Sequence, residues 1–322
     1  MIKNKGMILV TGSAGFIGFH ICKRLLADGY SVIGVDNFNN YYDVKLKKAR
    51  NDELKKNRRF NLIKKNILNL TKKDIKDVEF IFHEAAYAGV RNSVENPILY
   101  DKVNVHGTVR LLKLSVDSNV KKFLFASSSS VYGDLNKFPT PETYETNPIS
   151  PYGVSKLAAE KYCNAFYKCY GLPTISLRYF TVYGPWGRPD MLIMKVILSC
   201  YENKPLILFK KDKKIIDFRR DFSYIDDVVE ANILAMKSNI KNDIFNVSAK
   251  KDVSVKYVID FIANELGRKP NFVEAEPSPA DPLRTLGDIS KIKEKLGFEP
   301  KTSIEEGIRN TINWYKQYKG IK

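Results

Sequence analysis

The chain has 322 residues, of which 44% are hydrophobic, and it carries a formal net charge of +17. This length suffices for a large core or for two lobes around a cleft, and no apolar run reaches the roughly 18 residues that a membrane span needs. The four cysteines form no C-x-x-C pair, which argues against a disulfide framework or a metal site and predicts a reduced, cytoplasmic protein.

The excess of positive charge raises the question of nucleic-acid binding. Its densest runs are residues 45–59, which are interleaved with acids as in a solvated helix, and residues 210–220, which suit an anionic ligand. No DNA- or RNA-binding motif accompanies either run, and a lysine-rich composition of the thermophile type explains the charge equally well. Nucleic acid is therefore not the partner that we expect.

The first third of the chain has the pattern of a phosphate-binding turn. A buried-type strand (residues 7–10, MILV) leads into TGSAGFIG (residues 11–18), and an amphipathic helix follows to about residue 28. Small residues let backbone N–H groups approach a pyrophosphate, and the helix N-terminus adds positive potential. The next strand, residues 31–36, ends in Asp36, which can bind both hydroxyls of an adenosine ribose. In this order the elements predict a site for NAD rather than NADP.

The alternation of strands and helices continues along the chain. Further strands are predicted at residues 61–67, 79–85, 122–126 and 173–179, with helices near 94–118 and 151–170. This pattern predicts an α/β fold with a doubly wound parallel (Rossmann) sheet, whose ligands lie beyond the carboxyl ends of the strands.

The chain becomes richer in proline after residue 180, which suggests a smaller mixed α/β lobe over the cleft. Residues 243–248 are expected to return to the main sheet as a strand. The predicted domains are a Rossmann domain of residues 1–180 with 222–250, and a substrate lobe of residues 181–221 with 251–322.

The segment SPYGVSK contains a candidate base. Ser150 is a good N-cap, Pro151 suits the first helical position, and Tyr152 then lies one turn before Lys156 on the same face. Three other Tyr-x-x-x-Lys pairs occur, so spacing alone decides nothing. A neighbouring ammonium, the helix N-terminus and bound NAD would each favour the phenolate, which ordinarily forms only near pH 10. The hypothesis requires the serine run at residues 127–130 to help hold a substrate hydroxyl.

TGSAGFIG, SSSSVYG, SPYGVSK and LRYFTVYGPWGRPDM, in this order, resemble the extended short-chain dehydrogenase/reductase family, and within it the nucleotide-sugar 4-epimerases. Residues 36–50 and 85–93, together with FTVYGPWGRPDM, look most like UDP-glucuronate 4-epimerases. The resemblance covers nearly the whole chain. It implies an NAD-dependent isomerase that epimerises a UDP-sugar at C4 through a transient 4-keto intermediate. It also implies a homodimer formed through the helices near 94–118 and 151–170.

The resemblance implies a role for individual residues. Catalysis would use Ser128, the base Tyr152 and Lys156. The implied cofactor-binding residues are Gly12, Gly15, Phe16, Ile17, Gly18, Asp36, Asn37, Asn66, Ile67, Ala85, Ala86, Tyr87, Asn104, Tyr152, Lys156 and Tyr179. The implied substrate-binding residues are Ser128, Ser129, Ser130, Thr181, Arg188, Arg220, Arg284 and Asp288. Asn66 stands where family members often carry Asp.

The sequence predicts the reaction more closely than it predicts which UDP-sugar is the substrate. Ser129 and Ser130 stand where related dehydratases carry Asp-Glu and decarboxylases carry Glu, so neither reaction is expected. Arg188 could bind a sugar carboxylate bidentately, or it could bind diphosphate or order its own loop. A small residue at Thr285 could admit an N-acetyl group. UDP-glucuronate leads, UDP-glucose and UDP-N-acetylglucosamine are alternatives, and an NAD-binding sensor or RNA-binding Rossmann protein is the non-enzymatic alternative.

Overall fold

The computed structural model describes residues 6–211, 214–278 and 280–321. Its centre is a seven-stranded sheet with the order β11-β6-β5-β4-β1-β2-β3, in which every neighbouring pair is parallel. The strands are β1 (Met7–Thr11), β2 (Ser31–Val35), β3 (Phe60–Ile63), β4 (Val78–His83), β5 (Lys122–Ser128), β6 (Thr174–Tyr179) and β11 (Asn242–Val247). The strand order reverses between β1 and β4, which confirms the predicted doubly wound sheet and the return of the chain as β11.

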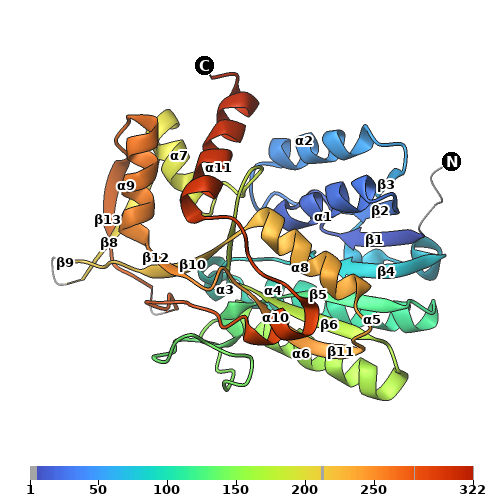
Figure 1. Ribbon diagram of the computed structural model, residues 1–322. Coiled ribbons are helices and arrows are strands. Elements are labelled where there is room, and N and C mark those ends of the chain that lie inside the picture. The colour runs from blue at the N-terminus through green and yellow to red at the C-terminus, as the bar shows by residue number, and fades with distance from the viewer. Residues whose placement is uncertain (1–5, 212–213, 279, 322) are drawn as a thin grey trace.

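Helices cover both faces of this sheet (Figure 1). One face carries α1 (Phe16–Ala27), α2 (Val44–Lys55) and α8 (Ile225–Lys237), and the other carries α5 (Gly107–Asp117) and α6 (Pro151–Tyr170). Because strand side chains alternate, Leu124 and Ala126 of β5 join one apolar core while Phe123 and Phe125 join the other. Burial on both faces fixes the sheet as a rigid platform for the loops at its carboxyl edge.

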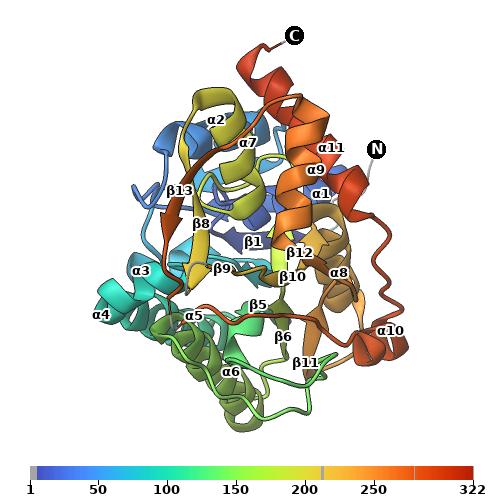
Figure 2. The same cartoon turned by 90° about the vertical axis from the view of Figure 1, so that its left-hand side faces the viewer.

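A smaller lobe holds two three-stranded sheets. One has the order β12-β10-β7 and the other β13-β8-β9. The elements of the lobe are β7 (Thr181–Tyr183), α7 (Leu192–Glu202), β8 (Pro205–Lys211), β9 (Lys214–Ile215), β10 (Arg219–Tyr224), β12 (Asp252–Ser254), α9 (Val255–Leu266), β13 (Asn271–Ala275) and α11 (Ile304–Lys319). Figure 2 faces this lobe and shows β8 and β13 beside α7 and α9. The short α10 (Ser290–Leu296) packs instead against β11.

The helix predicted near residues 94–118 is interrupted. The structure divides it into α3 (Val90–Glu95), α4 (Pro97–Tyr100), a π-helical turn η3 (Asp101–His106) and α5. The break falls at Asn96, whose φ of −129° and ψ of 50° are not helical, because proline at the next position disfavours the helical region for the residue before it. The wide turn η3 carries Asn104, whose contacts are described with the site.

The helix within residues 45–59 forms as predicted but is not simply solvated. Lys47 and Arg50 of α2 are 5% and 0% exposed. Both turn toward polar groups of the neighbouring loops rather than toward water. The second basic run, residues 210–220, includes residues 212–213, which lie outside the described part of the chain. Across the described ranges, no helix combines the length and hydrophobicity that crossing a bilayer requires.

Candidate active site

A cavity of about 740 Å³ lies at the carboxyl ends of β1, β2, β4, β5 and β6 and extends to the smaller lobe. Every predicted cofactor-binding residue except Asn104 lines it, and so does every predicted substrate-binding residue except Arg284 and Asp288. The structure thus brings together side chains that are separated by more than half of the sequence.

The glycine-rich turn after β1 leaves an open cradle beside α1. Gly12 has a φ of +68°, and a Cβ on it would lie 2.9 Å from the backbone nitrogen of Ala85. A Cβ on Gly18 would lie 2.3 Å from the carbonyl oxygen of Gly12. The N-cap of α1 is Gly15, which has no capping side chain, so the first N–H groups of the helix face the cavity without a side-chain acceptor. This space and these donors fit the pyrophosphate of a dinucleotide.

Asp36 follows β2 at the rim of this cradle. Its Oδ2 accepts a hydrogen bond from the Ala14 N–H at 3.1 Å, and its Oδ1 accepts one from the Phe38 N–H at 2.8 Å. These contacts fix the carboxylate against the turn and leave lone pairs directed at the cavity. Burial raises the pKa of Asp36, while the Phe38 hydrogen bond and the Lys47 ammonium oppose that rise. The geometry suits a ribose diol and disfavours a phosphate at the same place.

Asn104 acts from behind the cavity wall rather than lining it. Its Oδ1 accepts from the Tyr87 N–H at 2.8 Å, and its Nδ2 donates to the Tyr87 carbonyl at 2.9 Å and to Ser155 Oγ at 3.0 Å. The amide therefore holds the loop after β4 in place. Asn104 is predicted to lie near the cofactor, but in the structure it contacts Tyr87 and does not line the cavity.

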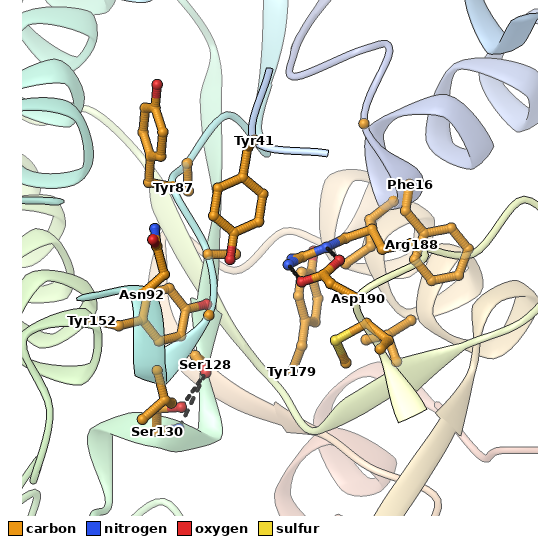
Figure 3. A pocket seen from close by; sticks show the side chains of 18 of the residues that line it. Phe16, Tyr41, Tyr87, Asn92, Ser128, Ser130, Tyr152, Tyr179, Arg188 and Asp190 are labelled. Atoms are coloured by element: carbon orange, nitrogen blue, oxygen red, sulfur yellow. Dashed lines mark hydrogen bonds and ion pairs between the residues drawn. The ribbon is translucent and has the colours of Figure 1, made fainter. Parts of the chain in front are cut away.

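Tyr152, Lys156 and Ser128 meet at the centre of the cavity. Ser150 Oγ accepts from the Gly153 N–H at 3.1 Å, so α6 begins as predicted and Tyr152 lies in its first turn. Lys156 Nζ donates to the Ala126 carbonyl at 2.7 Å and lies 5.9 Å from the centre of the Tyr152 ring. Ser128 Oγ donates to Ser130 Oγ at 3.1 Å and accepts from the Ser130 N–H at 3.1 Å, and the Ser128 hydroxyl also acts to lower the pKa of Tyr152. Figure 3 shows Tyr152, Ser128 and Ser130 on one wall.

The pKa of Tyr152 is raised in the protein alone, whereas the predicted lowering includes the charge of bound NAD. Burial raises it above its ordinary value, although the hydrogen bond from Ser128 and the positive charge of Arg188 act in the opposite direction. Burial likewise lowers the pKa of Lys156 to about 8. The protein alone therefore does not produce the phenolate, because desolvating the charged form outweighs the nearby positive charge.

Arg188 faces Tyr152 from the opposite wall, in the loop after β7 (Figure 3). Its Nε donates to Asp190 Oδ1 at 3.0 Å, and its Nη2 donates to Asp190 Oδ2. One edge of the guanidinium is thus occupied, while Nη1 and the second N–H of Nη2 remain for another acceptor. The guanidinium carbon also lies 5.4 Å from the centre of the Tyr41 ring.

Four side chains that sequence analysis did not single out also shape the site. Tyr41 lies between Tyr152 and Arg188 in Figure 3 and reaches the cavity from the loop after β2. Glu84 and Lys195 line the cavity, from the end of β4 and from α7. Arg50 donates to the Ala14 carbonyl at 3.0 Å and to the Trp186 carbonyl, and so connects the two ends of the site. Tyr41 lies in the segment 36–50, where the family resemblance offered a signal; the buried Arg50 gave none.

The predicted residues of the smaller lobe separate into two groups. Arg220 lines the cavity, donates to the Leu283 carbonyl at 3.1 Å, and has its pKa lowered by burial to about 10. Arg284 instead pairs with Asp252 through contacts of 2.9 and 3.2 Å. Asp288 Oδ1 accepts from the Ser290 N–H at 2.7 Å, at the start of α10. The structure therefore brings only Arg220 of these three to the cavity.

Comparison with known proteins places the molecule in a family. Residues 8–248 match the model of the NAD dependent epimerase/dehydratase family. The chain belongs to this family. It is 40% identical over 317 residues to the UDP-glucuronate 4-epimerase of Thermodesulfobacterium geofontis, covering 97% of each protein.

Two solved structures have the same fold. The UDP-glucuronic acid 4-epimerase of Bacillus cereus, in complex with UDP-glucuronic acid and NAD, matches with a TM-score of 0.91 at 34% identity, covering 97% of this chain and 99% of that one. The UDP-N-acetylglucosamine 4-epimerase of Methanobrevibacter ruminantium, in complex with UDP-N-acetylmuramic acid, matches with a TM-score of 0.87 at 29% identity, covering 98% and 99%. The predicted family and fold are confirmed.

Proposed function

We propose that this protein is an NAD-dependent nucleotide-sugar 4-epimerase that interconverts UDP-glucuronate and UDP-galacturonate. The observation that carries the proposal is the single cavity in which a dinucleotide cradle, the Tyr152–Ser128 pair and the Arg188 guanidinium face one another. The named epimerases among its relatives support the reaction class.

Cofactor binding is assigned to the cradle. Gly12, Gly15 and Gly18 leave the space for the pyrophosphate, and Asp36 receives the adenosine ribose. Lys156 keeps one N–H on the Ala126 carbonyl, so two remain for the nicotinamide ribose. When bound, NAD supplies a hydride acceptor that later serves as the hydride donor of the same cycle.

Tyr152 removes the proton from the sugar 4-hydroxyl and later returns it. Ser128 lines the cavity with Tyr152 and is fixed by the Ser130 N–H, so it can hold the 4-oxygen next to Tyr152 throughout the cycle. The pKa of Tyr152 must fall when the cofactor binds, because burial alone raises it. The 4-keto sugar turns over between the two hydride transfers, which requires that the nucleotide, held by the smaller lobe, supply most of the binding energy.

Arg188 is the proposed recognition group for the sugar carboxylate. Asp190 holds one edge of its guanidinium and leaves donors on the other edge, opposite Tyr152. Ser129 and Ser130 contain no acid that could take a proton from C5, which supports epimerisation over dehydration or decarboxylation. A neutral sugar would leave the free donors of Arg188 unpaired, and this disfavours UDP-glucose and UDP-N-acetylglucosamine.

Incubation of the protein with each UDP-sugar separately, followed by proton NMR of the products, tests the proposal. Formation of UDP-galacturonate from UDP-glucuronate, with no conversion of the neutral sugars, is the expected result. Conversion of neutral sugars alone would overturn the role of Arg188. Binding of NAD without turnover of any UDP-sugar would favour the sensor alternative, and salt-sensitive RNA retention would favour RNA binding.

We further propose a homodimer formed through the helices near 94–118, which the structure divides into α3 to α5, and near 151–170, which is α6, in the reduced environment of the cytoplasm. Ile98 and Val154 on these helices are 82% and 52% exposed, and Tyr162 and Tyr170 of α6 are exposed as well. Apolar side chains gathered on neighbouring helices are typical of a protein interface. The proposed domain division keeps the predicted boundaries at residues 180, 221 and 250, of which the second falls inside β10. Sedimentation of the wild type and of Ile98→Asp tests the dimer.

A further inference from the structure

The side-chain oxygens of Tyr179, Glu84 and Asn232 lie within hydrogen-bonding distance but have too few protons for every contact to be a hydrogen bond. Tyr179 Oη lies 3.0 Å from Glu84 Oε1 and 3.0 Å from Asn232 Oδ1. The amide of Asn232 is held in this orientation because its Nδ2 donates to the Val228 carbonyl at 2.8 Å. A phenol has one proton, so it cannot donate to both neighbours. If Glu84 were ionised, one of the two contacts would be a repulsive contact between acceptors.

A protonated Glu84 removes this conflict. Its carboxylic O–H donates to Tyr179, and Tyr179 in turn donates to Asn232. The surroundings agree with this assignment, since burial raises the pKa of Glu84 to about 7 against the opposing effects of Tyr179 and the Lys156 charge. The carboxyl group is therefore poised to gain or lose its proton near neutral pH.

The charged and titratable groups that act on Glu84 come from three elements. Lys156 and Tyr152 belong to α6, Tyr179 belongs to β6, and Cys22 belongs to α1. Of these, Lys156 is the only one among the described residues whose ordinary protonated form adds positive charge, and its own pKa of about 8 is sensitive to Glu84. Any ligand charge placed among these groups will shift the proton on Glu84.

We propose that Glu84, Tyr179 and Asn232 form a proton-holding chain that makes the preference of the site for oxidised over reduced dinucleotide depend on pH. This rests on the proposed function, which requires the reactive ring to lie beside the hydroxyl that Tyr152 deprotonates, and hence near Glu84. The oxidised nicotinamide ring is positively charged and favours the carboxylate, whereas the reduced ring is neutral and favours the carboxylic acid.

The direction of the effect follows from proton linkage. The oxidised ring lowers the pKa of Glu84 relative to the reduced complex. The preference for the oxidised form therefore rises with pH between those two pKa values and is constant outside them, with a slope of at most about tenfold per pH unit for one proton. An epimerase gains from this, because a dinucleotide left reduced by an escaped keto sugar makes the site inactive.

The test is a competition experiment at about pH 6 and about pH 8, on either side of the value of about 7 to which burial raises the pKa of Glu84. Purified protein is equilibrated with known mixtures of NAD and NADH, and the bound ratio is read from NADH fluorescence. Glu84→Gln keeps the size and a donor to Tyr179 but cannot ionise. Glu230→Gln makes the same change beside Arg24, away from the cavity, and serves as the matched control.

The wild type and the Glu230→Gln control should prefer the oxidised form several-fold more at the higher pH. Glu84→Gln should lose most of that change and retain only the part due to Lys156, and Glu84→Asp, which keeps an ionisable group, should restore it. Equal pH dependence in the wild type and Glu84→Gln would overturn this inference but would leave the proposed function standing. If neither dinucleotide binds at any pH, the proposed function itself fails.

Discussion

The two ends of the cavity are built by different means. The dinucleotide end uses backbone groups and glycines from one short stretch, residues 7–36, whose spacing is fixed by the sheet and by α1. The sugar end uses side chains from separate loops, held by ion pairs such as Arg188–Asp190. Backbone cradles admit one ligand shape, whereas paired side chains can exchange partners. Two relatives differ accordingly in the sugar nucleotide of their complexes, which is UDP-glucuronic acid beside NAD in the Bacillus cereus enzyme and UDP-N-acetylmuramic acid in the Methanobrevibacter ruminantium enzyme.

The strongest way to separate binding from chemistry is Tyr152→Phe. Loss of the phenolic oxygen removes the proposed base, so turnover should fall about 10³-fold while NAD remains bound. NMR of the sugar products and NADH-competition binding provide the two measurements. Tyr318→Phe, at an exposed position of α11 outside the cavity, is the control and should retain full activity. Substantial turnover by Tyr152→Phe would show that the base is assigned wrongly.

A second comparison concerns the sugar end alone. Arg188→Gln should lower kcat/KM for UDP-glucuronate about 30-fold, because a hydrogen bond to a charged group contributes about 2 kcal/mol. Arg284→Gln breaks an ion pair with Asp252 outside the cavity and should change kcat/KM by no more than about twofold. Steady-state kinetics with saturating NAD measure both values. A larger effect at Arg284 would restore its predicted role in nucleotide binding.

The connection between the two ends can be broken at Arg50. Arg50→Met removes the donors to Ala14 and Trp186 and leaves buried carbonyl groups unpaired, which should lower the free energy of unfolding by about 2 kcal/mol. Arg58→Met changes an exposed arginine close by and should stay within about 0.5 kcal/mol. Urea denaturation of the wild type, Arg50→Met and Arg58→Met measures these free energies of unfolding. Equal values for the wild type and Arg50→Met would show that Arg50 makes no net contribution to stability.

The smallest effect concerns the glycine turn. Gly12→Ala and Gly267→Ala both place a side chain at positive φ, +68° and +60°, and each should lose about 1 kcal/mol of stability for that reason. Only Gly12→Ala also presses on the backbone of Ala85, since nothing lies within 4 Å of a Cβ on Gly267. NAD affinity should therefore fall for Gly12→Ala alone. Unchanged NAD binding by this variant would argue against the cradle.

The dinucleotide end of the cavity could be predicted from the sequence more fully than the sugar end. Gly12, Asp36 and the start of α6 at Pro151 came from local patterns, because turns, caps and strand ends depend on neighbouring residues. Glu84 gave no such signal: its proton depends on Tyr179 and Asn232, which only the fold brings near.

Two errors had different origins. The break at Asn96 could have been predicted from Pro97, whereas the burial of Arg50 could not, since its surroundings in sequence, where acids are interleaved with many basic residues, resemble a solvated face. The expected lowering of the Tyr152 pKa includes the positive charge of bound NAD and stays a prediction; in the protein without NAD, burial raises this pKa.

The single guanidinium of Arg50, bound to carbonyl groups of both the Ala14 turn and the Trp186 loop, has a consequence for engineering new substrate specificity. A loop transplanted from another epimerase into residues 184–191 must present a carbonyl where Trp186 does now. Otherwise a buried cation loses one of its acceptors, and the damage appears as weakened folding before any altered sugar preference can be observed.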